Sequence, residues 1–199
     1  RAVISPDPDL DMDSVGIPED KAWEIYKPFI VRNLRRSGTP ALRASQLIAD
    51  RSTAAREALT EEMSKRPVIV NRAPTLHRYG IMAAWPRLVK GDSLKVSPLT
   101  IGGFGGDFDG DAMQFHVPAS EDAAKEAAEK LLPSRNLFAA SNFRAHYVPS
   151  KEFTVGLYEA SGAIDKKSPP KTYHTTADAL RAYRRGEIGV DRQVHIVNH

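Results

Sequence analysis

The sequence has no cysteine among its 199 residues. Disulfide bonds, zinc sites built on thiolates and cysteine nucleophiles are therefore excluded for this chain. It also lacks any run of about 18 apolar residues, so we expect no transmembrane helix. No charged and then apolar leader follows Arg1, so we expect no secretory signal. Charge of one sign is scarce too, because the formal net charge is only +3, which by itself says little about binding partners.

The composition that remains is that of a globular protein. Hydrophobic residues make up 41% and charged residues 27%, and 199 residues suffice for one or two domains with a hydrophobic core. In the proline-rich residues 1–18, Leu10 and Met12 alternate with aspartates, which predicts a half-exposed strand. Residues 19–66 have helical patterns with Ser52 as an N-cap, and Pro28 is expected to break the first helix or to begin a second one.

From Pro67 onward the pattern changes to short β-branched runs that glycine and proline separate, which predicts short strands up to about Val117. After them, Ser120, Ser150 and Thr176 are predicted to cap three further helices.

Three carboxylates stand within five residues, at Asp107, Asp109 and Asp111. Two carboxylates about 5 Å apart repel each other by on the order of 3 kcal/mol at an effective dielectric constant of about 20. A compact loop would not gather three of them without a cation, and carboxylate oxygens suit Mg²⁺ or Ca²⁺. Glycines surround the cluster at positions 102, 103, 105, 106 and 110, and they allow a ligand to approach the backbone closely.

Simpler interpretations compete with a metal site. A solvated acidic turn is the usual fate of Asp-Gly segments, although apolar residues interleave with these acids and indicate that the segment is anchored in a core. A calcium-binding EF-hand loop is excluded, because its sixth and twelfth positions, counted from Asp107, hold Ala112 and Pro118. A second acidic series at residues 7–13 lacks glycines, and we interpret it as the exposed face of a strand.

A basic segment precedes the carboxylates. Residues 67–106 carry a net charge of +4, from Arg72, Arg78, Arg87, Lys90 and Lys95 against Asp92. Positive groups beside metal-holding acids suit phosphate chemistry, because the metal binds some phosphate oxygens and arginine or lysine neutralises the others. The alternative is a solvated basic face.

These residues are specific enough to indicate a family. The octet Asn71-Arg72-Ala73-Pro74-Thr75-Leu76-His77-Arg78, followed by the triple-aspartate loop, resembles the largest catalytic subunit of multisubunit DNA-directed RNA polymerase, which in bacteria is the beta-prime subunit. Weaker similarity runs through nearly the whole chain, for example at Val15-Gly16-Ile17-Pro18, His116-Val117-Pro118 and Gly156-Leu157-Tyr158.

The resemblance implies an α+β fold with a double-psi beta-barrel core and helical insertions before and after the half that carries the metal loop. The first part of the barrel would be residues 1–18, and a helical insertion would follow at 19–66. The barrel with the metal loop would be 67–118. A mainly helical extension, near the channel through which nucleotides enter, would be 119–199.

The resemblance also implies an active site. The catalytic and metal-binding residues would be Asp107, Asp109 and Asp111, holding the Mg²⁺ that activates the RNA 3′-hydroxyl. A second Mg²⁺ would arrive with the nucleoside triphosphate. The substrate-binding residues would be Arg72, Gly105, Pro74 and Thr75, with Arg72 approaching the ribose of the incoming nucleotide.

The sequence departs from the family at Gly105-Gly106, where Asn-Ala is usual. Because that asparagine is credited with reading the ribose hydroxyl, ribose discrimination here is in doubt or depends more on Arg72. Ala112 also replaces the family's glutamine, and together these changes suggest a divergent member of a kind that a virus could encode.

The implied partners are the remainder of the largest subunit, the second barrel subunit, template DNA, product RNA and nucleoside triphosphates, with no membrane. The implied location is the cytoplasm with the nucleoid, or the host cytoplasm for a virus-encoded protein. Since the family's subunit is far longer, we expect an excised fragment or one piece of a split subunit, inactive in isolation. Two hypotheses stay open beside it: an RNA-dependent RNA polymerase on the same barrel, and a non-catalytic barrel that binds a cation.

Overall fold

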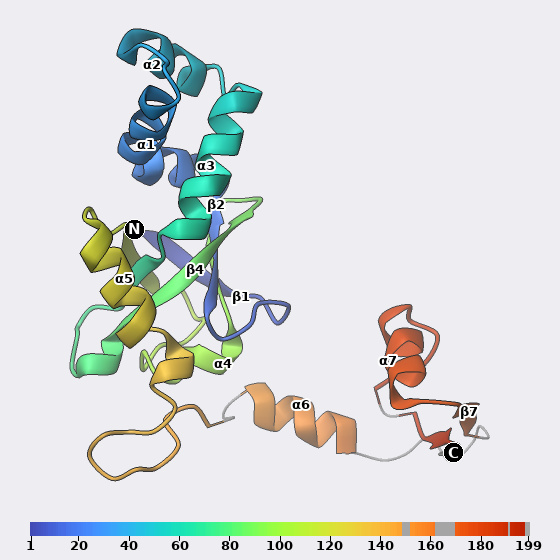
Figure 1. Cartoon of the computed structure of the whole chain (residues 1–199). Coiled ribbons are helices and arrows are strands. Elements are labelled where there is room, and N and C mark those ends of the chain that lie inside the picture. Colours follow the sequence, from blue (N-terminus) through green and yellow to red (C-terminus); the bar gives the residue numbers. More distant parts are fainter. Residues whose placement is uncertain (149–151, 162–169, 191, 198–199) are drawn as a thin grey trace. The chain divides into compact units, whose positions relative to one another are not determined.

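We describe the protein from a computed structural model, which covers residues 1–148, 152–161, 170–190 and 192–197 in detail (Figure 1). The chain divides into two compact units, the first ending at Val148 and the second beginning at Pro149. Within the residues so described, no helix is both long enough and apolar enough to cross a membrane.

The first unit alternates strands and helices. Its strands are β1 (Ala2–Pro6), β2 (Ser14–Pro18), β3 (Val68–Asn71), β4 (Ile81–Val89), β5 (Leu94–Val96) and β6 (Ala112–His116). Its α-helices are α1 (Glu19–Arg36), α2 (Ala41–Ala49), α3 (Thr53–Lys65), α4 (Pro98–Ile101) and α5 (Glu121–Lys130). Short 3-10 helices lie at η1 (Arg78–Gly80) and η2 (Pro133–Arg135).

The six strands form one closed barrel in the order β1-β5-β2-β4-β3-β6. Two of the neighbouring pairs, β1 with β5 and β2 with β4, are parallel, and the other pairs are antiparallel. Strand β6 pairs with both β1 and β3 and so closes the ring. The predicted α+β fold with a double-psi barrel core is confirmed by this closed barrel and its accompanying helices.

Alternating burial explains why these short segments become strands. Along β3, Val68 and Val70 are buried while the residues between and after them are half-buried. Leu94 of β5 and Met113 of β6 have no exposed surface. Inward-pointing side chains of period two therefore fill the barrel from strands that are far apart in the sequence.

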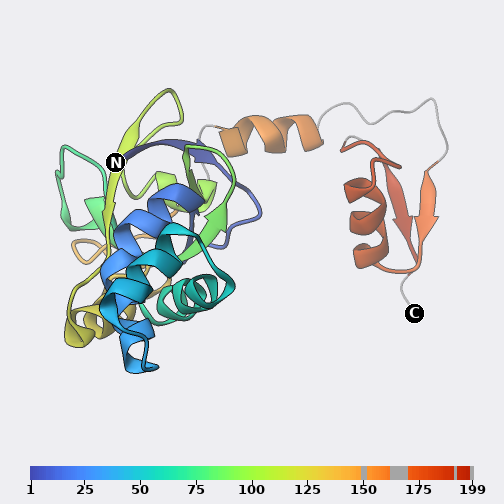
Figure 2. The same cartoon turned by 90° about the horizontal axis from the view of Figure 1, so that it is seen from above.

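Helices α1, α2 and α3 cover one end of the barrel (Figures 1 and 2). Helix α1 runs without interruption through Pro28, so the prediction that this proline breaks or restarts the helix was wrong. Its apolar face is buried on both sides of the proline, with Tyr26 and Ile30 fully buried, while Pro28 itself is exposed. Burial of that face outweighs the roughly 3 kcal/mol that an internal proline costs a helix.

The local signals near helix ends were more reliable than the strand signal near the chain start. The predicted caps are confirmed at Ser52, whose hydroxyl accepts from Ala55 N, and at Ser120, whose hydroxyl accepts from Ala123 N. The strand predicted around Leu10 and Met12 was wrong, because residues 7–13 form turns. Aspartate side chains make those turns by accepting backbone N–H bonds two residues on, as Asp11 does from Asp13 N at 2.9 Å.

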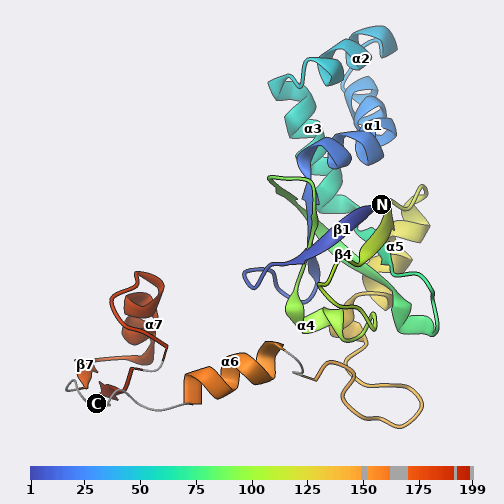
Figure 3. The ribbon, with the colours of Figure 1, turned by 180° about the vertical axis from the view of Figure 1, so that it is seen from behind.

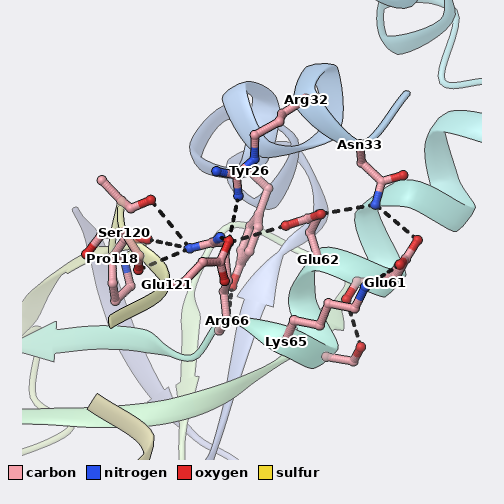
Figure 4. Close-up of polar contacts among 12 residues, drawn as sticks. Tyr26, Arg32, Asn33, Glu61, Glu62, Lys65, Arg66, Pro118, Ser120 and Glu121 are labelled. Atoms are coloured by element: carbon pink, nitrogen blue, oxygen red, sulfur yellow. Dashed lines mark hydrogen bonds and ion pairs between the residues drawn. The ribbon is translucent and has the colours of Figure 1, made fainter. Parts of the chain in front are cut away.

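Arg66 fastens the helices to the barrel (Figure 4). It follows α3 directly, is 1% exposed, and forms ion pairs with Glu62 of α3 and Glu121 of α5. One of its amino groups also donates to the backbone oxygens of Pro118 and Ser120, which follow β6. The guanidinium therefore joins the end of α3, the start of α5 and the segment after β6.

Two aromatic residues of α1 complete this cluster. The guanidinium carbon of Arg66 lies 4.5 Å from the centre of the Phe29 ring. The Tyr26 hydroxyl donates to Arg66 O at 2.7 Å, and burial raises the pKa of that phenol well above its ordinary value. Tyr26 therefore stays protonated and a hydrogen-bond donor at neutral pH.

The second unit contains helices α6 (Glu152–Ser161) and α7 (Thr176–Arg184) and a parallel pair of strands, β7 (Lys171–Tyr173) and β8 (Val194–Ile196). The cap predicted at Thr176 was wrong by one residue, because Thr175 has the extended backbone and accepts from Asp178 N. The cap predicted at Ser150 lies outside the described residues. The two strands were not predicted, since residues 119–199 were expected to be mainly helical.

Candidate active site

The three aspartates lie on the turn between helix α4 and strand β6. Backbone bonds tighten its first half, where Gly106 N donates to Ile101 O at 3.1 Å. Gly105 has a φ of +61°, in the left-handed region that glycine and asparagine adopt most readily. The turn therefore reverses the chain over residues 102–111, and Asp111 directly precedes the first residue of β6.

Neighbouring backbone groups hold two of the aspartates. Asp107 and Asp111 are half-buried, whereas Asp109 is exposed. Asp107 N donates to Asp111 Oδ2 at 3.0 Å, and Phe108 N donates to Asp107 Oδ1 at 2.9 Å. Ile4 N of strand β1 donates to Asp111 O at 2.9 Å, so the barrel itself fixes the end of the turn.

Arg72, which follows β3, reaches this turn. Its Nε donates to Asp111 Oδ2 at 2.8 Å, and the two side chains are 23% and 25% exposed. The octet and the aspartates, predicted separately from the sequence, therefore meet at the same end of the β3–β6 pair. An ion pair that is partly shielded from water is stronger than one on the open surface.

Gly106 leaves room for this contact. A Cβ atom at position 106 would lie 2.8 Å from Ile101 Cδ1 and 3.2 Å from Arg72 Cδ. The aliphatic part of Arg72 thus passes directly over the backbone of the turn, and a larger residue would push it away. The close approach that the glycines permit is used here by a side chain of the same protein.

The donor type in this turn suits a hard cation, because three carboxylates on one loop offer oxygen ligands of the kind that Mg²⁺ prefers. The side chains of the turn are not gathered into a complete metal site. Among the described residues, no group of three or more histidine, aspartate or glutamate side chains is placed to hold a metal ion. The guanidinium of Arg72 lies against Asp111, where it supplies the positive charge that a loop of carboxylates requires.

The remaining predicted substrate residues surround this contact. Pro74 and Thr75 are exposed, and the Thr75 hydroxyl donates to Asn71 Oδ1 at 2.7 Å. Asn71 Nδ2 in turn donates to Gln114 Oε1 at 3.3 Å across the β3–β6 pair. The structure thus brings Arg72 together with Asp107 and Asp111, and leaves Asp109, Gly105, Pro74 and Thr75 open to solvent around them.

The residues that pack behind the turn were not predicted. A Cβ at Gly103 would lie 2.7 Å from Tyr147 Cε1 and 3.1 Å from His146 Nε2. His146 is the last residue of a hairpin formed by residues 137–146, and Tyr147 follows it. This hairpin lies with α4 at the barrel end opposite α1–α3 (Figure 3). Burial lowers the pKa of His146, and the nearby His77 lowers it further. No spacing in the sequence links positions 103 and 146, so no signal could have found this contact.

The chain is similar to known RNA polymerase subunits. The family described as RNA polymerase Rpb1, domain 2, matches residues 40–132. The chain is 36% identical over 200 residues to DNA-directed RNA polymerase subunit beta′ of Bacteroides thetaiotaomicron, covering 99% of this chain and 14% of that protein. It is 35% identical over 199 residues to the same subunit of Xylella fastidiosa strain M23, covering 98% and 14%. Nearly the whole chain is thus similar to one section of RNA polymerase beta-prime subunits.

The match to the beta-prime family covers the site but little of the relatives. All the predicted site residues, from Arg72 to Asp111, lie inside the matched residues 40–132. The subunit of Paraburkholderia xenovorans shows the same relation, with 36% identity over 98% of this chain and 14% of that protein. The chain thus spans about a seventh of the length of the curated relatives that it matches.

Proposed function

We propose that this chain is the section of a DNA-directed RNA polymerase that holds the catalytic Mg²⁺ and contacts the incoming nucleoside triphosphate. It would act within an assembly with the remainder of the largest subunit, the second barrel subunit, template DNA and product RNA. The observation that carries the proposal is the ion pair between Arg72 and Asp111, because it joins a phosphate- or ribose-binding cation to a loop of metal-binding carboxylates. The beta-prime names of the relatives support the same assignment.

In the assembled enzyme Asp107, Asp109 and Asp111 would hold Mg²⁺. Their oxygen atoms are the ligands that this ion prefers, and the exposed Asp109 faces solvent, from which an ion and a substrate could arrive. When bound, Mg²⁺ supplies Lewis-acid stabilisation of negative charge on the reacting oxygens. The isolated chain should bind it weakly, because Mg²⁺ keeps much of its water and relies on substrate phosphates.

The proposed reaction is nucleotide transfer to the RNA 3′ end. The 3′-oxygen forms a bond to the α-phosphorus, the bond from that phosphorus to the bridging oxygen breaks, pyrophosphate leaves with the bonding electrons, and the hydroxyl proton passes to water. Arg72 would orient the incoming nucleotide through its guanidinium, which offers five N–H donors in a fixed plane. Its contact with Asp111 would keep that guanidinium beside the metal loop while a substrate is absent.

A non-catalytic barrel is the second candidate. It is favoured by one observation, that the described residues include no gathered group of metal-binding side chains. An RNA-dependent polymerase on the same barrel has less support, since the relatives named above are DNA-directed enzymes. Replacing one carboxylate distinguishes a working metal loop from a remnant.

The experiment measures templated nucleotide addition by the polymerase assembled with this chain. We expect Asp109→Ala to lower the rate about a thousandfold, because a lost metal ligand removes several kcal/mol of charge stabilisation. Asp92→Ala is the matched control, since Asp92 is also an exposed loop aspartate and lies in the basic segment of residues 67–106. Equal activity of the two variants would refute the metal role and favour the non-catalytic barrel.

Metal binding should also be measured directly. Mn²⁺ can replace Mg²⁺ as the probe, because its unpaired electrons report binding to carboxylates without any reaction. We expect the assembled enzyme that carries Asp109→Ala to bind Mn²⁺ more weakly than the one that carries Asp92→Ala. This readout separates loss of the metal from loss of the nucleotide.

A further inference from the structure

The 137–146 hairpin ends in a tight turn. Ala139 N donates to Arg144 O at 2.8 Å, and Phe143 N donates back to Ala139 O at 2.9 Å. Phe138 and Ala145 pair one step below. These bonds close the hairpin on residues 140–143, so Phe143 occupies the last position of the turn.

Phe143 has a backbone conformation that a bulky residue rarely adopts. Its φ is +54°, in the left-handed region that glycine or asparagine normally fills at the end of such turns. A bulky aromatic residue there is strained, and its side chain is 83% exposed, so burial within this chain does not offset the strain. A strained, exposed aromatic residue at a hairpin tip indicates a contact made with something outside the chain.

The chemistry around Phe143 indicates what that contact is. Residues 133–148 contain Arg135 and Arg144 and no acidic residue. Arg144 is exposed, and among the residues that the structure describes it takes part in no ion pair. An exposed aromatic ring beside a cation that lacks a carboxylate partner is the arrangement that binds single-stranded nucleic acid, since the ring stacks on a base and arginine neutralises a phosphate.

The tip is held firmly against the active-site end of the barrel. Ala140 N donates to the Tyr79 hydroxyl at 2.9 Å, and the Tyr79 and His146 rings lie 3.9 Å apart. His146 and Tyr147 pack against Gly103 of the aspartate turn. The guanidinium of Arg78 lies 5.8 Å from the Tyr79 ring and adds a second cation to the same surface.

We propose that Phe143 is a stacking platform for a base of single-stranded nucleic acid, with Arg144 contacting the adjoining phosphate. The strand passes beside the aspartate turn that carries the proposed function, and the inference rests on that function only for the identification of the strand as template or product. RNA and DNA share the base and phosphate chemistry that the tip recognises, so both are tested.

The experiment measures binding of the full chain to fluorescent single strands of about ten nucleotides by anisotropy at low salt, once with RNA and once with DNA. We expect Phe143→Ala to weaken binding about tenfold, and Phe143→Trp to preserve it, because stacking needs an aromatic face. Phe143→Gly should weaken binding while it raises the thermal midpoint, because it removes the ring and the strain together. Arg144→Ala should lessen the salt dependence of binding.

The matched control is Leu42→Ala, which removes another exposed apolar side chain, on helix α2 at the opposite end of the barrel. Equal affinities of Phe143→Ala and Leu42→Ala would overturn the proposal, and so would a wild-type chain that binds neither strand. If Phe143→Ala instead weakens only assembly with the other polymerase subunits, the tip is a protein contact and the proposal is wrong. Tighter binding of RNA than DNA would identify the strand as product.

The two proposals fail separately. Asp109→Ala should lower the rate of nucleotide addition about a thousandfold and leave the affinity for single strands unchanged. If Asp109→Ala stays active while Phe143→Ala loses affinity, the metal role is refuted and the stacking platform stands. The reverse pattern refutes the platform alone.

Discussion

Strand β3 has an arginine near each end, and the two differ in almost every respect. Arg66 lies before the strand, is 1% exposed, and has carboxylates, backbone oxygens and an aromatic ring around it. Arg72 lies after the strand, is about a quarter exposed, and uses its Nε for Asp111. The same side chain thus serves two ends of one strand in different ways.

The difference indicates which arginine can do chemistry. The guanidinium of Arg66 is committed to groups of its own chain, so releasing it would leave the buried Glu62 without its charge partner. The guanidinium of Arg72 can exchange a carboxylate for a ligand at little cost, because water already reaches both partners. Arg66 therefore maintains the fold, and under the proposed function Arg72 is the arginine that is available to bind the substrate.

The largest expected effect is on stability at the Arg66 end. Arg66→Met should lower the free energy of unfolding by about 3–5 kcal/mol, because it leaves the buried carboxylate of Glu62 without its charge partner. Urea unfolding, followed by the fluorescence of the buried Trp23, measures the change.

The double variant Arg66→Met with Glu62→Met should recover much of that loss, since no charge then remains buried without a partner. If Arg66→Met costs no more than Arg72→Ala, the distinction between the two ends is wrong.

A smaller effect on stability, with a clear effect on activity, is expected at the other end. Arg72→Ala should lower the free energy of unfolding by about 1 kcal/mol or less. The assembled polymerase should lose about ten- to hundredfold in kcat/KM for nucleoside triphosphates, the value of a hydrogen bond to a charged group. Arg87→Ala is the matched control, because Arg87 also pairs with an aspartate, Asp11, at 3.3 Å, but on the exposed surface. Equal losses in both variants would mean that Arg72 has no substrate role.

A still smaller effect on stability is expected at Gly105. Gly105→Asn should lower the free energy of unfolding by less than about 1 kcal/mol, because a Cβ there meets nothing within 4 Å and asparagine is among the side chains least strained at a φ of +61°. If this position reads the ribose, the preference for ribonucleotides over deoxyribonucleotides should rise. Gly105→Val tests the backbone alone, because a β-branched residue is strained at this φ. An unchanged sugar preference in Gly105→Asn would assign ribose discrimination to Arg72 instead.

The smallest expected effect is a pH dependence at the Arg72 end. Burial holds the pKa of His146 below its ordinary value of 6.5, so the unfolded chain binds more protons than the folded one just below that pH. Stability should therefore fall slightly as the pH is lowered from about 7 to about 5. Thermal midpoints of wild type and His146→Asn measure it, and the variant should show the flatter profile. An identical slope in both would exclude His146 as the cause.

Local features of this fold could be predicted from the sequence, because they depend on neighbours along the chain. The serine caps at 52 and 120 need only a hydroxyl three residues before a free N–H group. The strand from Val68 needs only alternating burial. Where a local rule failed, a competing contact prevailed, as at Pro28, which the buried face of α1 overrides.

The site itself could be predicted only in part. The spacing of the aspartates and the octet predicted residues that the structure brings together at one end of the barrel, and the resemblance predicted the barrel. The ion pair between Arg72 and Asp111 joins positions 39 apart in the sequence, and the packing of His146 on Gly103 joins positions farther apart still. Such contacts depend on how the barrel closes, which no periodicity in a single sequence encodes. The strain at Phe143 was equally invisible, since it depends on φ.

The closure of the barrel by β6 has a consequence for the order of events during synthesis. Strand β1 precedes the other strands of the barrel, yet its parallel partner β5 follows about 90 residues later and its antiparallel partner β6 about 110 residues later. Until then β1 has two unpaired edges, which can pair with other chains. Pairings so distant in sequence form slowly. A truncated chain that stops short of Ala112 should therefore aggregate, while a released chain that extends a few residues past His116 can close its barrel and protect its edges.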